Sequence, residues 1–422
     1  MFKKSLLVLG AVFISSSFVF AGEVDLLVNK LVEKGVLDAG EGQTIMTETT
    51  EEMKKDIAKG KADTAPAWTQ NISLKGDLRI RYQTDQAVNA ANRDRMRLRL
   101  RIGAATRIVD NFNAGFGLAT GGRKTAVLPA AYPASSQIDI VDGESRSTNY
   151  TFGDTLSKGG LMVDYAYLQY EPSSKYKILL GKFSNPLWQP TDLLWDTDLN
   201  PDGISLPLTF QAGNNLSLFV TPSYFVLDEI AASNDPGIFS VQPGFKLTLN
   251  ENLSLKTAFV MYNTQFIKGG KLDNSAKTNT AGTVALRNEY NAMNPSIQFD
   301  ILDLMGYSVS LFGDYVTNPS SNTANTGYCA GINFGAAKVA NLGDWQVKAL
   351  SRYLETDAWL DTFPDSDSYG GATNCQGYEA IFTYGLSANT SISIDYYSMD
   401  KITGKTATTP KTLTQVDLVM KF

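Results

Sequence analysis

The chain of 422 residues contains no histidine. Ser/His/Asp and Cys/His nucleophile systems need an imidazole as the base, and His-ligated zinc sites need one as a ligand, so all of these are excluded. Paired carboxylates could still hydrolyse sugars, but no clustered acid pair stands out on a structured cleft. We therefore expect a protein that is not an enzyme and that requires neither a cofactor nor a metal.

Cysteine is scarce, and positive charge is in deficit. The two cysteines, Cys329 and Cys375, fall in ranges that predict strands with one other strand between them. Two interstrand steps amount to roughly twice 4.8 Å, which is too far for a disulfide, so we expect both thiols to be free. The net charge of −6 argues against nucleic acid as a partner.

Long hydrophobic runs are missing beyond the N-terminus, and the mean hydropathy is −0.14. The apolar run over 6–20 follows two lysines, and residues suited to signal cleavage precede Gly22. We predict that residues 1–21 are a secretory signal, cleaved between Ala21 and Gly22. The alternative is a membrane-spanning helix, for which this run is at the short end of the range.

Residues 22–64 have a different periodicity from the rest of the chain. Val24, Leu27, Val28 and Leu31 recur at helical spacing, and a charged, helix-prone run follows over 43–59. We predict a short periplasmic segment of helical or coiled-coil-like character, followed by a linker. It would serve either as a solvated spacer or as a contact with the cell wall or with neighbouring protomers.

From residue 70 onward, apolar and polar residues alternate, which is the period of a strand with one apolar and one polar face. Leu78 and Ile80 share one face of the first such range, and Arg79 and Arg81 share the other. Strands are predicted over 70–82, 95–109, 112–122, 161–171, 175–183, 203–212, 215–227, 238–250, 252–265, 290–302, 306–317, 325–338, 342–357, 372–387, 389–400 and 411–422.

The connections between these ranges alternate in length. Short turns such as Asp110-Asn111 alternate with longer connections such as 123–160 and 184–202. In an up-and-down barrel, short turns face the periplasm and long loops face the outside. The predicted fold class is therefore all-β. Residues 65–422 would form a transmembrane antiparallel up-and-down β-barrel of about sixteen strands, with fourteen or eighteen as alternatives.

The last strand carries a further signal. In the range 411–422, Val416, Leu418, Met420 and Phe422 share one parity, so the strand has one apolar face and ends on an aromatic residue. Such an end resembles those of bacterial outer-membrane barrel proteins. The resemblance implies that Phe422 is an assembly signal read by the barrel-assembly machinery. The alternative is an ordinary amphipathic strand that happens to be last.

Arginines concentrate on the polar face of the first two predicted strands. An arginine that faces lipid costs ~2–4 kcal/mol at the bilayer midplane, so in a barrel these side chains must face the water-filled lumen. The alternative is the solvated face of a soluble sheet. We predict a pore-lining basic wall formed by Arg79, Arg81, Arg95, Arg97, Arg99 and Arg101.

The connection over 184–203 is both acidic and apolar, and it contains no lysine or arginine. We predict that it folds into the lumen and forms a constriction whose acids are Asp192, Asp196, Asp198 and Asp202. The alternation of Asp196, Asp198, Asn200 and Asp202 imitates a calcium loop. It lacks the sixth-position glycine and the closing glutamate of the EF-hand pattern, so no metal is expected.

The signal, the helical preface, the strand pattern and the segment L-W-D-x-D-x-N-P-x-G over 194–203 together resemble the bacterial outer-membrane putative-porin family. The plan is also similar to that of general diffusion porins, although the helical preface departs from many of them. The resemblance implies a water-filled channel in the cell outer membrane for small hydrophilic solutes and ions.

The partners implied by this resemblance are outer-membrane lipid and lipopolysaccharide, small polar solutes and two further copies in a homotrimer. The alternative function is a structural or adhesive surface-exposed barrel with a plugged lumen, which would bind an external partner through its long loops.

Overall fold

The structure is a computed structural model that describes residues 71–121, 124–127, 137–140, 144–153, 158–281 and 285–422, together with isolated residues between 28 and 51. Contacts divide the chain into two units, between Asn71 and Ile72. The predicted signal and its cleavage site at Ala21 and Gly22 lie outside the described residues. No helix in the described part of the chain is long and apolar enough to cross a membrane.

The first unit is described at a few positions within the predicted helical segment. The backbone N–H of Asp38 donates to Glu41 Oε2 at 3.1 Å, and the N–H of Glu41 donates to Asp38 Oδ1 at 2.8 Å. This reciprocal pair is a capping box, and Glu41 and Ile45 are helical. The remainder of the 22–64 segment lies outside the described residues.

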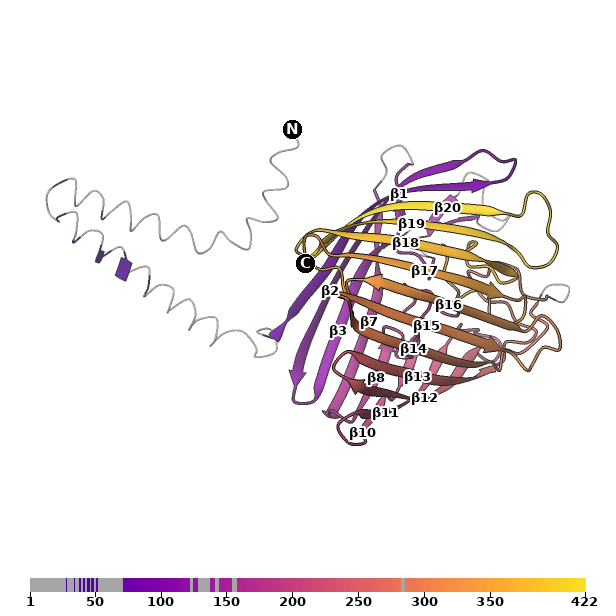
Figure 1. Ribbon diagram of the computed structural model, residues 1–422, viewed down its shortest axis with the longest axis horizontal. Helices are drawn as coiled ribbons and strands as arrows, with labels where there is room; N and C mark the ends of the chain where they lie inside the picture. Colours follow the sequence, from indigo (N-terminus) through magenta and orange to yellow (C-terminus); the bar gives the residue numbers. More distant parts are fainter. Residues whose placement is uncertain are drawn as a thin grey trace. The chain divides into compact units, whose positions relative to one another are not determined.

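The second unit is a closed barrel of antiparallel strands (Figure 1). In order around the wall, the strands are β1 (Ser73–Ala87), β2 (Arg93–Val109), β3 (Phe112–Gly121), β7 (Gly160–Ser173), β8 (Tyr176–Lys182), β9 (Asp202–Ser205), β10 (Leu208–Gln211), β11 (Leu216–Val226), β12 (Gly237–Asn250), β13 (Leu253–Gln265), β14 (Met293–Leu304), β15 (Tyr307–Thr317), β16 (Thr326–Gly335), β17 (Trp345–Leu354), β18 (Cys375–Ser387), β19 (Thr390–Lys401) and β20 (Lys411–Lys421). The long connection after β3 contains a hairpin of β4 (Lys124–Val127) and β5 (Gln137–Ile140), and then β6 (Tyr150–Thr151), which pairs with β2.

The barrel closes where β20 pairs with β1, in a register that runs from Asp77 opposite Lys421 to Ala87 opposite Lys411. Strands β9 and β10 share one position between β8 and β11, so the wall has sixteen positions. The predicted all-β, up-and-down, sixteen-stranded architecture is confirmed.

Two local differences from the predicted ranges have physical causes. The range 203–212, predicted as one strand, is broken between β9 and β10, where Pro207 has no N–H to give to a ladder. Strands β1 and β2 extend toward each other, so only 88–92 connect them instead of the expected 83–94.

Burial along the strands is reversed relative to a soluble protein. On β1, Arg79 and Arg81 are 8% and 3% exposed, whereas Leu74 is 71% exposed and Tyr82 is 44% exposed. The same alternation of exposed apolar and buried polar residues continues along β20 and β14. An apolar outer face and a polar inner face are the pattern of a barrel that stands in lipid.

Long connections fill part of the interior with an apolar core. Two of them matter most: loop 183–201, between β8 and β9, and loop 355–374, between β17 and β18. Trp195 of loop 183–201 stacks on Phe363 of loop 355–374 with ring centroids 4.6 Å apart, and its Nε1 donates to Tyr262 OH on β13 at 3.0 Å. Trp359 is fully buried and donates from Nε1 to the carbonyl of Leu194 at 2.8 Å.

The two cysteines lie on the inner side of the barrel wall. Cys329 is on β16 and Cys375 begins β18, with β17 between them, and both are buried and free. The prediction of free thiols is confirmed.

Candidate functional site

The predicted basic wall lies on the inner face of β1 and β2. The register places Arg79 directly opposite Arg99, and Arg81 directly opposite Arg97. Like charges in opposed positions repel, so each pair needs a carboxylate nearby. Asp77 on β1 supplies one, because Arg99 Nε donates to its Oδ1 at 2.8 Å and Arg101 Nε donates to its Oδ2 at 2.7 Å.

Asp417 supplies the second carboxylate from the last strand. It lies opposite Arg81 in the β1–β20 pairing, and Arg81 donates to its two oxygens from Nε and Nη2, each at 2.7 Å. Arg79 Nη1 lies 3.4 Å from Asp417 Oδ2. A bidentate guanidinium–carboxylate pair fixes geometry as well as charge, so the wall is ordered at the seam where the barrel closes.

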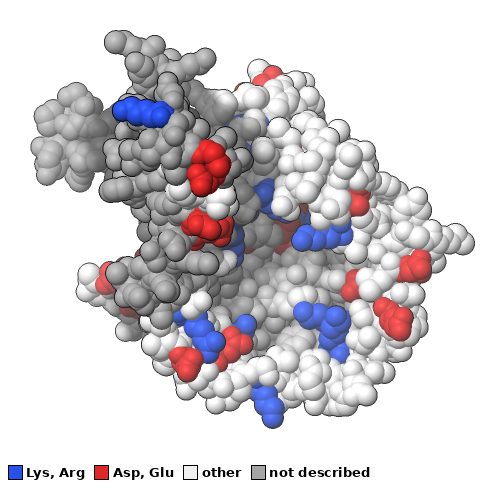
Figure 2. Space-filling model, turned by 90° about the vertical axis from the view of Figure 1, so that its left-hand side faces the viewer, with Lys and Arg blue, Asp and Glu red and all other residues white. Residues whose placement is uncertain are grey.

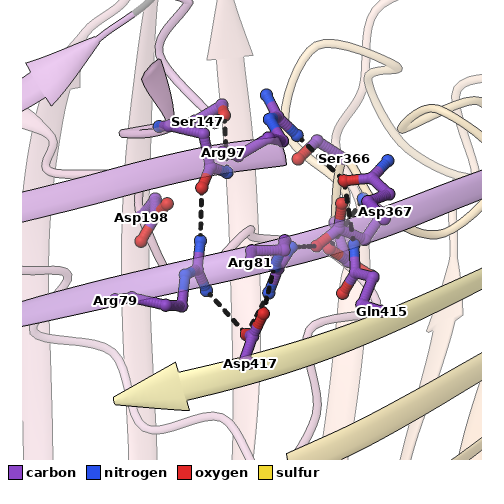
Figure 3. A network of polar contacts seen from close by, with 12 residues as sticks. Arg79, Arg81, Arg97, Ser147, Asp198, Ser366, Asp367, Gln415 and Asp417 are labelled. Carbon is purple, nitrogen blue, oxygen red and sulfur yellow. Dashed lines mark hydrogen bonds and ion pairs between the residues drawn. The ribbon is translucent and has the colours of Figure 1, made fainter. Parts of the chain in front are cut away.

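Interior segments contact the wall at three points, and Figure 3 shows the one at which Arg81 lies between Asp367 and Asp417. Arg79 Nη2 donates to Asn149 Oδ1 at 2.6 Å, in the stretch 144–149 that precedes β6. Arg81 Nη1 donates to Asp367 Oδ2 of loop 355–374 at 3.0 Å. Arg101 Nη1 donates to Asp198 Oδ1 of loop 183–201 at 3.3 Å. We call the group of Arg79, Arg81, Asn149, Asp367 and Asp417 the arginine network.

The two remaining arginines of the predicted wall lie nearer the long-loop end. Arg95 Nη2 donates to Asp85 Oδ2 at 2.6 Å. Arg97 Nη1 donates to Gln83 Oε1 at 3.1 Å, and its buried Nε has no partner among the residues that the structure describes. All six predicted arginines therefore lie on one continuous inner surface of β1 and β2.

The four predicted acids do not lie together. Asp198 reaches the wall, and its Oδ2 also accepts a hydrogen bond from Thr148 Oγ1 at 3.1 Å. Asp192 is paired with Arg352 on β17, away from the wall. Asp202 begins β9, is exposed, and pairs with Lys182 at 3.0 Å.

Asp196 is buried where loop 183–201 meets loop 355–374. Its Oδ2 accepts from the backbone N–H of Ser366 at 2.8 Å, and its Oδ1 accepts from the N–H of Asp198 at 2.9 Å. Burial, together with the neighbouring Asp198 charge, raises the pKa of Asp196 to about 7. For Asp192, burial favours the neutral acid, but the charges of Arg352 and Lys348 outweigh it and lower the pKa.

Asp367 is the acid that sequence reasoning missed. It faces Arg81 from loop 355–374, and burial is outweighed there by Arg81, so the pKa of Asp367 is lowered and the carboxylate stays charged. The signal was present in the sequence, because 358–371 is acidic and apolar and has no lysine or arginine, as 184–203 does.

Carboxylates are not arranged as a cation site in loop 183–201. Asp196, Asp198, Asn200 and Asp202 turn to four separate partners, Asn200 Nδ2 donating to Asp164 Oδ1 at 2.9 Å. A different trio, Asp192, Asp365 and Glu379, has oxygens within 4.8 Å of one another. Arg352 pairs with Asp192 and Lys348 pairs with Glu379, so side-chain cations already neutralise two of these three carboxylates.

Two cavities lie on either side of the arginine network. The one toward the long loops has a volume of about 530 Å³ and is lined by charged groups that include Asp85, Arg93, Arg95, Arg97, Glu144, Asp367 and Lys411. The one toward the C-terminal end has a volume of about 390 Å³, and its charged lining residues are Lys75, Asp77, Arg101, Asp164, Asp198 and Lys421. Basic and acidic side chains surround a hollow at that end (Figure 2).

Comparisons with known proteins agree with this architecture. The family described as putative porin matches residues 86–298 and 270–422. No curated protein matches the sequence.

Solved structures with a similar fold include OprB of Pseudomonas putida, at 9% identity and a TM-score of 0.54 over 84% of this chain and 95% of that one. OmpF of Salmonella typhi, in complex with daunomycin, has 12% identity and a TM-score of 0.48 over 83% and 98%. The outer membrane channel DcaP of Acinetobacter baumannii has 12% identity and a TM-score of 0.45 over 83% and 97%. The chain belongs to the putative porin family and is an outer-membrane β-barrel channel protein.

Proposed function

We propose that this protein is a passive diffusion channel for small hydrophilic solutes and ions. The observation that carries the proposal is the pair of charged cavities on opposite sides of the arginine network, along the same inner wall of β1, β2 and β20. A solute would enter from the long-loop cavity, pass the network and leave through the cavity at the C-terminal end.

Side chains of the arginine network lie between the two cavities. Arg79 crosses from β1 to Asn149, and Arg81 crosses to Asp367. Side chains change rotamer far faster than strands move, so a path would open without a change in the barrel. No chemical step is required, and we propose that the protein has no catalytic role.

Opposed charges would set the selectivity of this path. Basic groups of β1 and β2 face Asp198 and Asp367 on the interior loops. Charges less than about 10 Å from a solute still act on it in 0.1 M salt, because that is the Debye length. The field across the path favours hydrated polar solutes over apolar ones.

The proposal extends to assembly and surroundings. Phe422 would be read by the barrel-assembly machinery, the exposed apolar face would contact outer-membrane lipid and lipopolysaccharide, and three copies would form a homotrimer. The exposed apolar belt of the strands supports the lipid contact.

The test is conductance of the purified protein in a planar bilayer under a salt gradient. Asp198→Asn combined with Asp367→Asn removes two acids that face the wall, so the reversal potential should shift toward anions. Asp202→Asn is the matched control, because Asp202 is exposed and paired with Lys182, and its selectivity should equal that of the wild type.

Two outcomes would overturn the proposal in different ways. A folded wild-type barrel that carries no current would favour the structural or adhesive alternative. Unchanged selectivity in the double variant would show that ions do not pass the arginine network.

A further inference from the structure

A third cavity lies at the C-terminal end of the barrel, beneath loop 183–201. Its volume is about 470 Å³, and it is bounded by the inner faces of β8 and β10 to β13. It adjoins the 390 Å³ cavity at Ser184, which lines both. The two cavities differ in charge. The 390 Å³ cavity has both acidic and basic side chains in its lining, whereas every charged side chain that lines the third cavity is basic.

Three lysines line the third cavity, and no aspartate or glutamate does. They are Lys177 on β8, Lys246 on β12 and Lys256 on β13. None of the three forms an ion pair with a described residue. The positive charge of these lysines is therefore not neutralised by an ion pair within the described part of the chain.

The register brings two of these lysines directly together. Lys246 and Lys256 are opposite each other in the β12–β13 pairing, a placement that destabilises a sheet when both residues carry the same charge. Asp300 on the next strand attracts Lys256 from a distance, but the two form no ion pair. Asp300 accepts hydrogen bonds from Gln298 Nε2 at 2.9 Å and Ser310 Oγ at 2.6 Å instead of pairing with a lysine.

Lys256 lies against an aromatic surface. Lys256 Nζ lies 4.5 Å from the ring centroid of Trp188 and 5.3 Å from that of Phe219, distances at which a cation is attracted to the ring. Trp188 is fixed by Gln242, which is fully buried: the Trp188 N–H donates to Gln242 Oε1 at 2.7 Å, and Gln242 Nε2 donates to the Trp188 carbonyl at 2.8 Å. The cavity is preformed.

We propose that this cavity is an oxyanion-binding subsite for small multivalent organic anions, in which an anion bridges Lys246 and Lys256. Hydroxyl groups of Ser184, Thr209 and Ser217 also line it and would donate to further oxygens of the same ligand. Its volume exceeds what a single inorganic anion needs, which favours a polycarboxylate or a phosphate ester. The role of this subsite in transport rests on the proposed diffusion function, whereas its ability to bind anions does not.

Binding is measured by titration calorimetry on the detergent-solubilised barrel at low ionic strength, with citrate as the probe and inorganic phosphate as the second anion. Lys246→Gln combined with Lys256→Gln should weaken citrate binding by about tenfold or more, because both charged hydrogen-bond donors to the anion are removed. Lys246→Arg keeps the charge and should retain binding. Lys338→Gln is the matched control, because Lys338 is exposed on the connection between β16 and β17.

Folding is checked on the same samples by the temperature at which the barrel loses its compact form on a gel. Without citrate, the double glutamine variant should be at least as stable as the wild type, because it loses a repulsion. Equal citrate affinity in the double variant and the wild type would overturn the proposal, as would an absence of citrate binding to the wild type. Phosphate bound as tightly as citrate would contradict the assignment to multivalent organic anions.

A bilayer measurement separates this proposal from the diffusion function. Citrate added on the side of the C-terminal end should reduce the current of the wild type and spare that of the double variant. A barrel that binds citrate but conducts no ions would refute the diffusion function and leave the subsite standing. If the barrel conducted ions, but citrate neither changed the current nor produced binding heat in the calorimeter, the subsite alone would be refuted.

Discussion

Asp196 is buried between two interior loops, and its carboxylate accepts backbone hydrogen bonds from both of them. Its pKa of about 7 results from burial and from the neighbouring Asp198 charge. In most proteins a response to pH near neutrality comes from histidine, which this chain lacks. Here the response to pH comes from Asp196, a carboxyl group whose pKa is raised to about 7.

The channel should therefore change selectivity between pH 8 and pH 6. As the pH falls through about 7, Asp196 takes up a proton, the interior loses a negative charge, and the reversal potential should shift toward anions. Because the folded-state pKa is raised, the folded barrel binds this proton before the unfolded chain does, so Asp196 also favours folding increasingly as the pH falls from 8 toward 4.

The measurement is the reversal potential of the wild type and of Asp196→Asn at both pH values. The variant should show little change between them. A shift of equal size in the variant would assign the titration elsewhere, for example to Asp365, whose pKa is raised by burial and by the charge of Asp192.

At the scale of the elements, loops 183–201 and 355–374 act as one interior body. Trp195 joins them by stacking on Phe363 and by its hydrogen bond to Tyr262 on the wall. Asp361 and Asp357 tie the second loop to its neighbours, accepting from Thr278 N at 2.5 Å and from Thr280 N at 2.8 Å respectively.

Trp195→Ala should loosen this interior body. Removing a buried tryptophan costs about 3–5 kcal/mol, so the temperature at which the barrel unfolds on a gel should fall, and single-channel currents should become larger and noisier. Trp345→Ala is the control for the substitution itself, because Trp345 belongs to a partly exposed aromatic cluster with Tyr307 and Phe334 at the short-turn end. If the currents of Trp195→Ala were as small and as quiet as those of the wild type, the two loops would not line the conduction path.

The strands and the basic wall could be predicted from the sequence because side-chain direction in a strand is a local property. The parity of Arg79 and Arg99 is enough to place both on the inner face, and the hairpin sets their register. The position of an interior loop depends on contacts between distant segments. Asp198 therefore meets Arg101 whereas Asp192, six residues earlier, turns to Arg352, and no local pattern distinguishes these two acids.

At the scale of the whole molecule, the seam between β1 and β20 that closes the barrel extends as far as Phe422. Gly76 N–H donates to the Phe422 carbonyl at 2.8 Å, and Phe422 N–H donates to the Gly76 carbonyl at 3.0 Å. The Phe422 ring lies over Gly76, where a Cβ would meet a ring carbon at 2.5 Å. Glycine at this position leaves room for the terminal aromatic ring.

Deletion of Phe422 should greatly reduce insertion into the outer membrane and leave export across the inner membrane intact, because it removes two closing hydrogen bonds and the terminal ring. The measurement is the amount of heat-modifiable barrel in the outer-membrane fraction, and Phe422→Tyr is the control that keeps an aromatic end. A normal yield from the deletion would show that Phe422 is not an assembly signal.

The reversed burial of the strands also governs how the molecule responds to heat and denaturant. Leu168, Ile297 and Ile394, which lie within β7, β14 and β19, are 51%, 52% and 49% exposed in the folded barrel, so their apolar surface is already covered by lipid or detergent rather than by protein. Unfolding in a micelle transfers little of that surface to water, whereas the heat-capacity increment and the denaturant slope of a soluble protein arise from such a transfer. Both quantities should be small per residue here and should come chiefly from the interior loops, which gives the barrel a flat stability curve over a wide range of temperature.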